Sequence, residues 1–360
     1  MKQKQNKSAL KVNPGISQPP DVNPSKKIYR KKRSLSTKQF VAGIRECNIS
    51  ILSQAITMIE SNLYEHRKQA YEIINECLPF SGNSIRIGIT GSPGVGKSTF
   101  IENIGNYVIG RKHKLAVLAI DPSSERSKGS ILGDKTRMET LAVNPSAYVR
   151  PSPSKGSLGG VASRTREAMI LCEAAGFDCI FIETVGVGQS ETLVHSMVDF
   201  FLLLQLAGAG DELQGIKRGI MEMADAIVIT KADGTNTRIA EMARVQYANA
   251  MTLFPVPASG QRPSVLTCSA VYNNGIPEIW DYISNFINTT VNNGYFSQNR
   301  KDQQLYWLFE NIKDNLNENF FNNEKVKALL PELQRQISQS KISSIAASHK
   351  LLEAFFGKGN

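Results

Sequence analysis

Long apolar runs are missing from this sequence. No stretch of ~18 consecutive apolar residues occurs, which is the length that a membrane-spanning helix needs. The most apolar segment, FFLLLQLAGAG at 200–210, is too short and is typical of a buried strand. We therefore expect no membrane span and no membrane partner.

Patterns of cysteine and histidine that bind metals or form disulfides are also missing. The five cysteines are scattered and form no C-x-x-C pair: Cys47, Cys77, Cys172, Cys179 and Cys268. The four histidines are dispersed too, so we see no zinc-type cluster. An odd number of scattered cysteines is typical of reduced thiols in a cytoplasmic protein, and we expect that location.

Excess positive charge is nearly absent beyond residue 36. Residues 1–36 hold ten Lys or Arg against the single acid Asp21, so this segment supplies +9 of the formal net charge of +10. It is rich in Pro, Asn and Ser and poor in apolar residues, so we expect a disordered tail. Its run KKIYRKKR leaves a nucleic-acid contact open. The nearly neutral remainder favours a solvated tail and no nucleic-acid partner.

Short apolar runs alternate with amphipathic segments between residues 81 and 290. Strands are expected at 85–90, 115–121, 178–184, 199–206, 225–230 and 265–270. Helices are expected at 96–110, 162–176, 212–223, 235–250 and 276–288. Nearly continuous apolar strands between such helices are typical of an α/β fold, with a mainly parallel sheet covered on both faces.

Helical periodicity marks both ends of the chain. The spacing of apolar residues in 37–80 predicts two helices, the second with an apolar stripe through Tyr71, Ile74 and Leu78. Residues 291–360 show helical periodicity and no strand signal, and their apolar stripe must be buried against the α/β domain or a second copy. That stripe consists of Leu305, Leu308, Ile312 and Leu316. The expected parts are a tail (1–36), a helical extension (37–80), an α/β domain (81–290) and a helical arm (291–360).

The stretch IGITGSPGVGKSTF at 87–100 fits the phosphate-binding pattern G-x-x-x-x-G-K-[ST]. Its glycines let backbone N–H groups face phosphates, and the helix that follows adds its dipole. Lys97 is expected to reach the β- and γ-phosphates, Ser98 to bind Mg²⁺, and Thr99 to lie beside the α-phosphate. The expected phosphate contacts are Gly91, Ser92, Pro93, Gly94, Val95, Gly96, Lys97, Ser98 and Thr99.

The stretch AIVITKADG at 226–234 carries a candidate base reader. Its residues Thr230 to Asp233 resemble the [NT]-K-x-D motif of G proteins. The Asp233 carboxylate can accept hydrogen bonds from N1–H and the 2-amino group of guanine, and adenine offers neither donor. The stem of Lys231 would lie along the base. A second loop, TCSA at 267–270, is expected to bring Ser269, Ala270 and Val271 against guanine, so the nucleotide is GTP or GDP.

Carboxylates follow two of the expected strands. Asp121 and Glu183 lie at strand ends, where ligands bind in open α/β sheets. Asp134 lies in the polar segment 121–141 between them. Because Mg²⁺ takes one or two carboxylates besides phosphates and waters, we expect these three acids and Ser98 to form its site. Gly186 is placed to donate its N–H to the γ-phosphate.

Five stretches in this order resemble the MeaB/ArgK family of G-protein chaperones. They are GITGSPGVGKST, LAIDPSSERSKGSILGDKTRME, FIETVGVGQSE, LAGAGDELQGIKRGIMEMAD and TKADG. The resemblance covers about residues 45–290 and implies a P-loop NTPase of the SIMIBI type. It also implies a GTPase that gates adenosylcobalamin loading and protects or reactivates methylmalonyl-CoA mutase or a related B12-dependent acyl-CoA mutase. It further implies a homodimer formed partly by the C-terminal arm.

The resemblance also assigns roles to single residues. It marks 121–138, 183–189 and 207–218 as three switch segments. It places Lys97, Asp134, Glu183 and Lys217 in catalytic roles, with Asp121, Asp134 and Glu183 in the Mg²⁺ or catalytic positions. Thr230 departs from the more usual Asn. No arginine or glutamine is clearly poised for hydrolysis apart from the candidate Arg137, so slow intrinsic turnover is expected.

Three alternatives stay open at this point. A nickel-delivery GTPase shares the nucleotide fold but usually carries a His-rich run or a Cys/His site. A small-molecule P-loop kinase would need an acceptor pocket, and a TKAD base reader is atypical of kinases. A nucleic-acid-associated GTPase would use the basic tail, in which case RNA binding would depend on salt.

Overall fold

The structure is a computed structural model that describes residues 35–61, 63–120, 138–151, 158–184, 190–207 and 218–357. The chain divides into two units, Met1–Ser36 and Thr37–Asn360. The fold below is that of the second unit. Its division into an extension, a P-loop domain and an arm stays a prediction.

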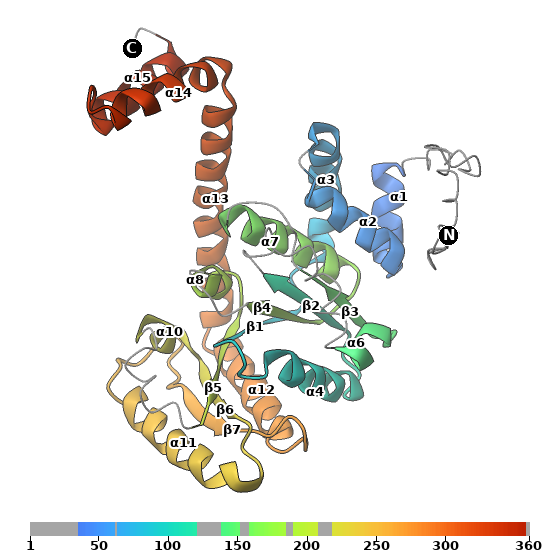
Figure 1. Cartoon of the computed structure of the whole chain (residues 1–360). Coiled ribbons are helices and arrows are strands. Elements are labelled where there is room, and N and C mark those ends of the chain that lie inside the picture. The colour runs from blue at the N-terminus through green and yellow to red at the C-terminus, as the bar shows by residue number, and fades with distance from the viewer. Residues whose placement is uncertain are drawn as a thin grey trace, which may run out of the picture. The chain divides into compact units, whose positions relative to one another are not determined.

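Seven parallel strands form a single sheet with the order β3-β2-β4-β1-β5-β6-β7 (Figure 1). They are β1 (Ile85–Gly91), β2 (Leu115–Ile120), β3 (Ala147–Arg150), β4 (Cys179–Thr184), β5 (Phe200–Leu206), β6 (Ala226–Thr230) and β7 (Ser264–Thr267). The central strand β1 pairs with β4 and β5, so that Ile87 lies opposite both Phe181 and Phe200. The glycine-rich loop therefore leaves the middle of the sheet at its carboxyl edge.

Helices cover both faces of this sheet (Figure 1). On one face α4 (Lys97–Gly110) and α12 (Ile276–Asn292) share a buried cluster with alternate strand residues such as Ile87 and Ile89. The other face carries α7 (Leu158–Ala174), α8 (Ser190–His195), α10 (Arg218–Met223) and α11 (Thr237–Met251). This arrangement confirms the predicted α/β class with a parallel sheet.

Two short helices and a short strand had not been predicted. They are α6 (Glu139–Val143), α8 and β3, which pairs with β2 at the edge of the sheet. The strand expected at 265–270 is shorter than predicted and ends at Thr267. Its chain turns because Asn273 and Gly275 have positive φ angles of 56° and 79°, and Ser269 pairs with Asn274 across that turn.

The N-terminal extension contains three helices where two were expected. They are α1 (Thr37–Arg45), α2 (Ile49–Ile59) and α3 (Tyr64–Cys77), and each contacts α7. Cys47 has a positive φ of 57°, and the Asn48 side chain caps α2, so the chain breaks there. In α3 the buried residues are Ala70, Ile73 and Cys77. The predicted stripe was therefore wrong by one residue, and Tyr71 is exposed.

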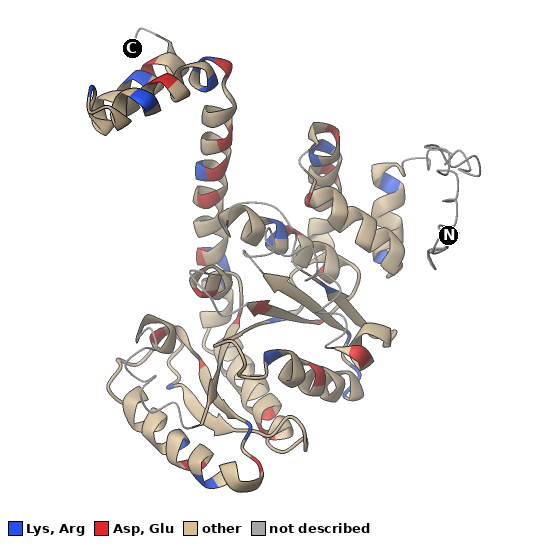
Figure 2. Cartoon of the chain, viewed as in Figure 1, with Lys and Arg blue, Asp and Glu red and all other residues tan. Residues whose placement is uncertain are grey.

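Three helices follow α12: α13 (Tyr295–Asn322), α14 (Glu324–Ser338) and α15 (Ser344–Phe356). A small core of Val326, Leu333, Ala347 and Leu351 holds α14 and α15 together. Charged side chains of both signs lie along α13, whereas the strands carry few (Figure 2). No helix in the described ranges is both long and apolar enough to cross a membrane.

The apolar stripe of the arm is not buried by the α/β domain. Its side chains are 45–58% exposed. The α13 residues that are buried are Gln303 and Trp307, on the opposite side of the helix. The prediction that the α/β domain buries this stripe is therefore wrong. Burial against a second copy of the chain remains as the other predicted arrangement.

Candidate nucleotide site

The glycine-rich loop between β1 and α4 has the backbone that phosphate binding requires. Gly91, Gly94 and Gly96 have φ angles of 154°, 82° and 94°, which side-chain-bearing residues rarely adopt. A Cβ on Gly91 would lie 2.5 Å from the Leu204 carbonyl oxygen, so only glycine fits there. The first N–H groups of α4 have no acceptor within their helix and are available to phosphate oxygens.

Lys97 is the first residue of α4 and is buried. Its ammonium group donates to the carbonyl oxygens of Gly91 (2.8 Å) and Ser92 (3.3 Å). Burial lowers the pKa of this ammonium group, and the carboxylates of Glu183 and Glu191 oppose that effect. The lysine therefore lies against the loop that would hold the phosphates, with two acids close enough to influence its charge.

Two threonine hydroxyls join the strands that carry this site. The side chains of Thr90 on β1 and Thr184 on β4 are buried and lie 2.7 Å apart. Thr90 directly precedes the phosphate loop, and Thr184 directly follows Glu183. Glu183, which is half-buried, therefore lies on a strand that is tied to β1 where the loop begins.

The two base-reading loops contact each other. The Ser269 hydroxyl donates to Oδ2 of Asp233 (2.5 Å). Between the same loops, the backbone N–H of Ala232 donates to the Cys268 carbonyl oxygen (2.9 Å). Ala270 is half-buried and Val271 is exposed. The structure thus brings together Asp233 and Ser269, two residues that sequence reasoning assigned to guanine.

The first base loop is also bonded to the phosphate loop. The Thr230 hydroxyl donates to the carbonyl oxygen of Val95 (2.8 Å), and the Lys231 ammonium donates to that of Gly94 (3.0 Å). Sequence reasoning considered Thr230 only as a substitute for a base-contacting Asn. Its observed contact holds the base reader at a fixed distance from the phosphate loop.

Several expected site residues lie outside the residues that the structure describes. They are Asp121, Asp134, Arg137, Gly186 and Lys217. Within the described ranges, the hydroxyl of Ser98 and the carboxylate of Glu183 are oxygen donors of the kind that Mg²⁺ prefers. The roles of all these residues stay predictions.

Sequence reasoning missed two polar residues beside this site. Ser190 and Glu191 begin α8, and their exposed fractions are 0% and 4%. Within the described part of the chain, the Ser190 hydroxyl has no hydrogen-bond partner. Polar residues in the first turn of a helix are usually exposed, so nothing in the sequence indicated that Ser190 and Glu191 are buried.

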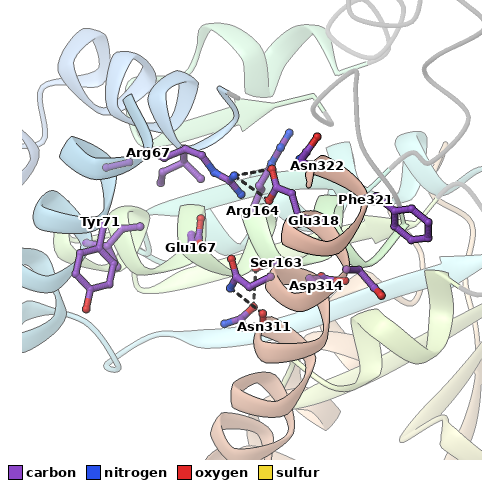
Figure 3. Close-up of a pocket in the computed structure, with 16 residues that line it drawn as sticks. Arg67, Tyr71, Ser163, Arg164, Glu167, Asn311, Asp314, Glu318, Phe321 and Asn322 are labelled. Atoms are coloured by element: carbon purple, nitrogen blue, oxygen red, sulfur yellow. Dashed lines mark hydrogen bonds and ion pairs between the residues drawn. The ribbon is translucent and has the colours of Figure 1, made fainter. Parts of the chain in front are cut away.

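A separate cavity of about 810 Å³ lies between α3, α7 and α13 (Figure 3). The Arg67–Glu318 ion pair (2.8 Å) bridges it, and the Ser163 hydroxyl donates to Asn311 inside it. Burial raises the pKa of the Glu167 carboxyl in this cavity to about 7. None of the nucleotide-site residues above lines the cavity, so it is not part of that site.

A parallel α/β sheet, a glycine-rich loop with a buried lysine and a carboxylate-bearing base loop define a P-loop nucleotide-binding protein. Sequence comparison with known proteins supports this class. A probable GTPase of Mycobacterium tuberculosis is 47% identical over 310 residues, covering 86% of this chain and 92% of that protein. GTPase ArgK of Escherichia coli is 46% identical over 281 residues, which are 78% of this chain and 85% of that protein.

The family model for methylmalonyl-CoA mutase-associated GTPase MeaB matches residues 52–325, and the chain belongs to this family. It is a GTP-hydrolysing enzyme that binds GTP and GDP. The mouse mitochondrial methylmalonic aciduria type A homolog is 42% identical, over 88% of this chain and 77% of that protein. The crystal structure of an LAO/AO transport system kinase superposes with a TM-score of 0.68, at 35% identity, over 88% of this chain and 96% of that one.

Proposed function

We propose that this GTPase is a chaperone of methylmalonyl-CoA mutase or a related B12-dependent acyl-CoA mutase. In this role it gates the loading of adenosylcobalamin and protects or reactivates the mutase. The observation that supports the proposal most directly is the family match across residues 52–325, whose name includes the mutase. The name of the related mouse protein, methylmalonic aciduria type A homolog, also refers to methylmalonic acid.

The proposed nucleotide contacts follow from the geometry. The backbone N–H groups of residues 91–99, apart from Pro93, which has none, surround the phosphates. Lys97 exchanges its carbonyl partners for the β- and γ-phosphates. Asp233 accepts the two guanine donors, with Ser269 orienting its carboxylate and Lys231 lying along the base. Water then attacks the γ-phosphorus of GTP, giving GDP and phosphate, while these groups position and neutralise the phosphates.

Mg²⁺ fits the oxygen donors that the chain provides. Ser98 and Glu183 would hold it, with Asp121 and Asp134 as the further carboxylates. Bound there, the ion would neutralise charge on the β- and γ-phosphates. Lys217 would act from the third switch segment, next to the partner protein.

Nucleotide state would reach the mutase through the switch segments 121–138, 183–189 and 207–218. Loss of the γ-phosphate removes the group that orders such segments. The direct test supplies apo-mutase and adenosylcobalamin with this protein and either GTP or GDP, and follows cofactor loading by absorbance. Loading that depends on the nucleotide supports the proposal. Loading that is identical without the protein contradicts it, and transfer of phosphate from GTP to a small molecule would favour a kinase.

We also propose a homodimer formed through the exposed stripe of α13. Five apolar side chains on this face are 45–60% exposed: Leu305, Leu308, Phe309, Ile312 and Leu316. A continuous apolar stripe at helical spacing is typical of a helix–helix interface. Ile312→Asp should convert the dimer to a monomer in analytical ultracentrifugation. Gln304→Asp adds the same charge beside the stripe and should leave the dimer intact, whereas a wild-type monomer would refute the interface.

A further inference from the structure

The segment that joins α8 to β5 is bonded to the C-terminal arm at three successive points. The Trp307 indole donates to the Ser196 carbonyl oxygen (3.1 Å). The Gln303 amide donates to the Val198 carbonyl oxygen (2.7 Å), and Arg300 forms an ion pair with Asp199 (2.7 Å). Because positions 300, 303 and 307 share one face of a helix, α13 runs along residues 196–199 with this face against them.

These contacts are shielded from water. Trp307 is 1% exposed, Gln303 is 8% exposed and Asp199 is 6% exposed. Buried polar groups are costly to separate from their partners. A displacement of residues 196–199 would therefore move the root of the arm with them.

The other end of α8 lies beside the nucleotide site. Glu191 is buried, and its carboxylate, after that of Glu183, opposes the lowering by burial of the pKa of Lys97 in the phosphate loop. Its neighbour Ser190 has a buried hydroxyl without a partner among the described residues. A buried, unsatisfied hydroxyl calls for an explanation, and a second arrangement of this turn that supplies the missing partner is one.

The last turn of α8 and the residues after it pack tightly on the central strand. A Cβ placed on Gly88 of β1 would lie 2.8 Å from Val194 and 3.2 Å from Val198. Only glycine at position 88 allows this close approach. Helix α8 and the residues after it are therefore expected to shift together, because a local rearrangement would open the contact with β1.

We propose that α8 transmits the nucleotide state to the C-terminal arm, with Glu191 as a counter-charge of Lys97 that GTP displaces and residues 196–199 as the contact with α13. The inference rests on the nucleotide site proposed above, in which Lys97 binds the phosphates. Without nucleotide, the Glu191 carboxylate is a counter-charge for the lysine. When GTP binds, the γ-phosphate competes for the same ammonium group and repels the carboxylate, so the start of α8 moves.

Trp307 provides the readout for this motion. The chain has two tryptophans, and the other one, Trp280, is buried in the α/β core. In a Trp280→Phe background, Trp307 emission should differ between the GDP complex and the complex with a non-hydrolysable GTP analogue. Glu191→Gln should abolish this difference. It should leave binding of the GTP analogue unchanged or tighter by up to about tenfold, because a like charge near the phosphates is removed.

The matched control is Glu222→Gln, the same change on the exposed surface of α10, which should keep the emission difference. Identical Trp307 emission in both complexes would overturn the proposal. A Glu191→Gln variant that keeps the Trp307 emission difference, or that binds the GTP analogue more weakly, would also overturn it. Failure of the wild-type chain to bind GTP would instead refute the nucleotide site. Binding without any effect on the mutase would refute the chaperone function alone.

A measurement on the wild-type chain covers the case in which the variant does not fold. Hydrogen exchange should show that amides of both 190–199 and 300–307 change protection between GDP and the GTP analogue. A change confined to 190–199 would contradict transmission to the arm.

Discussion

The hydroxyl of Ser269 donates a 2.5 Å hydrogen bond to the carboxylate of Asp233, across 36 positions of sequence. This contact orients the group that we expect to read guanine. Ser269→Ala should weaken GTP binding by roughly 10- to 150-fold, the usual effect of one lost hydrogen bond to a charged group. Nucleotide preference should stay with guanine. Calorimetric titration measures both, and Ser284→Ala on α12 is the control with an intact site.

Asp233 itself should decide which base is bound. Asp233→Asn replaces an acceptor with a donor, so the preference should move from GTP toward xanthosine triphosphate, whose extra carbonyl needs a donor. Competition between the two nucleotides measures the change. A variant that keeps the normal preference for guanine would show that Asp233 does not contact the base.

Arg300 should be a major contributor to stability. It forms an ion pair with Asp199, whose side chain is 1% exposed, and also donates to the carbonyl oxygen of Ser84. Arg300→Met leaves the buried carboxylate without its counter-charge and should cost about 3–5 kcal/mol. Arg335→Met breaks an exposed pair with Glu332 and should cost less than about 1 kcal/mol. Urea unfolding of both variants tests this ranking, and equal losses would contradict it.

Glu167 should make stability depend on pH. Burial raises the pKa of its carboxyl from 4.5 to about 7, against the opposing effect of nearby arginines. The folded state therefore binds the proton more tightly than the unfolded state, and this group's contribution falls as pH rises from about 4.5 to 7. Glu167→Gln should raise the free energy of unfolding at pH 8 by ~1–3 kcal/mol and change it little at pH 5.

The control for this effect is Glu353→Gln, which changes an exposed glutamate on α15. It should shift the unfolding midpoint equally at both pH values. An equal response of Glu167→Gln at the two pH values would mean that its carboxyl titrates normally.

The sequence predicted the sheet well because each of its long strands is a nearly continuous apolar run with turn residues at both ends. It also predicted the phosphate and base loops, because glycine, lysine and aspartate have specific roles there. It missed β3, a strand of four residues with only Tyr148 buried. In α3 the helical period was right and the buried face was wrong by one residue, because that face depends on contacts with α7.

The remaining features depend on residues far apart in the chain. Trp307 bonds to Ser196 across 111 positions, and Arg150 pairs with Glu60 across 90. No local pattern marks such partners, because they are set by how helices dock on the finished sheet. The buried turn of Ser190 and Glu191 was missed for the same reason.

The most direct test of the proposed function is GTP hydrolysis by the purified chain, with ATP as control, alone and with a cobalamin-dependent acyl-CoA mutase from the same source. Lys97→Ala should abolish nucleotide binding and provides the baseline, with Lys114→Ala as the control for lost charge. We expect a slow, GTP-selective rate that rises when the mutase is added. A GTP-selective rate that ignores the mutase would contradict the proposed function, and equal hydrolysis of ATP would contradict the base reader.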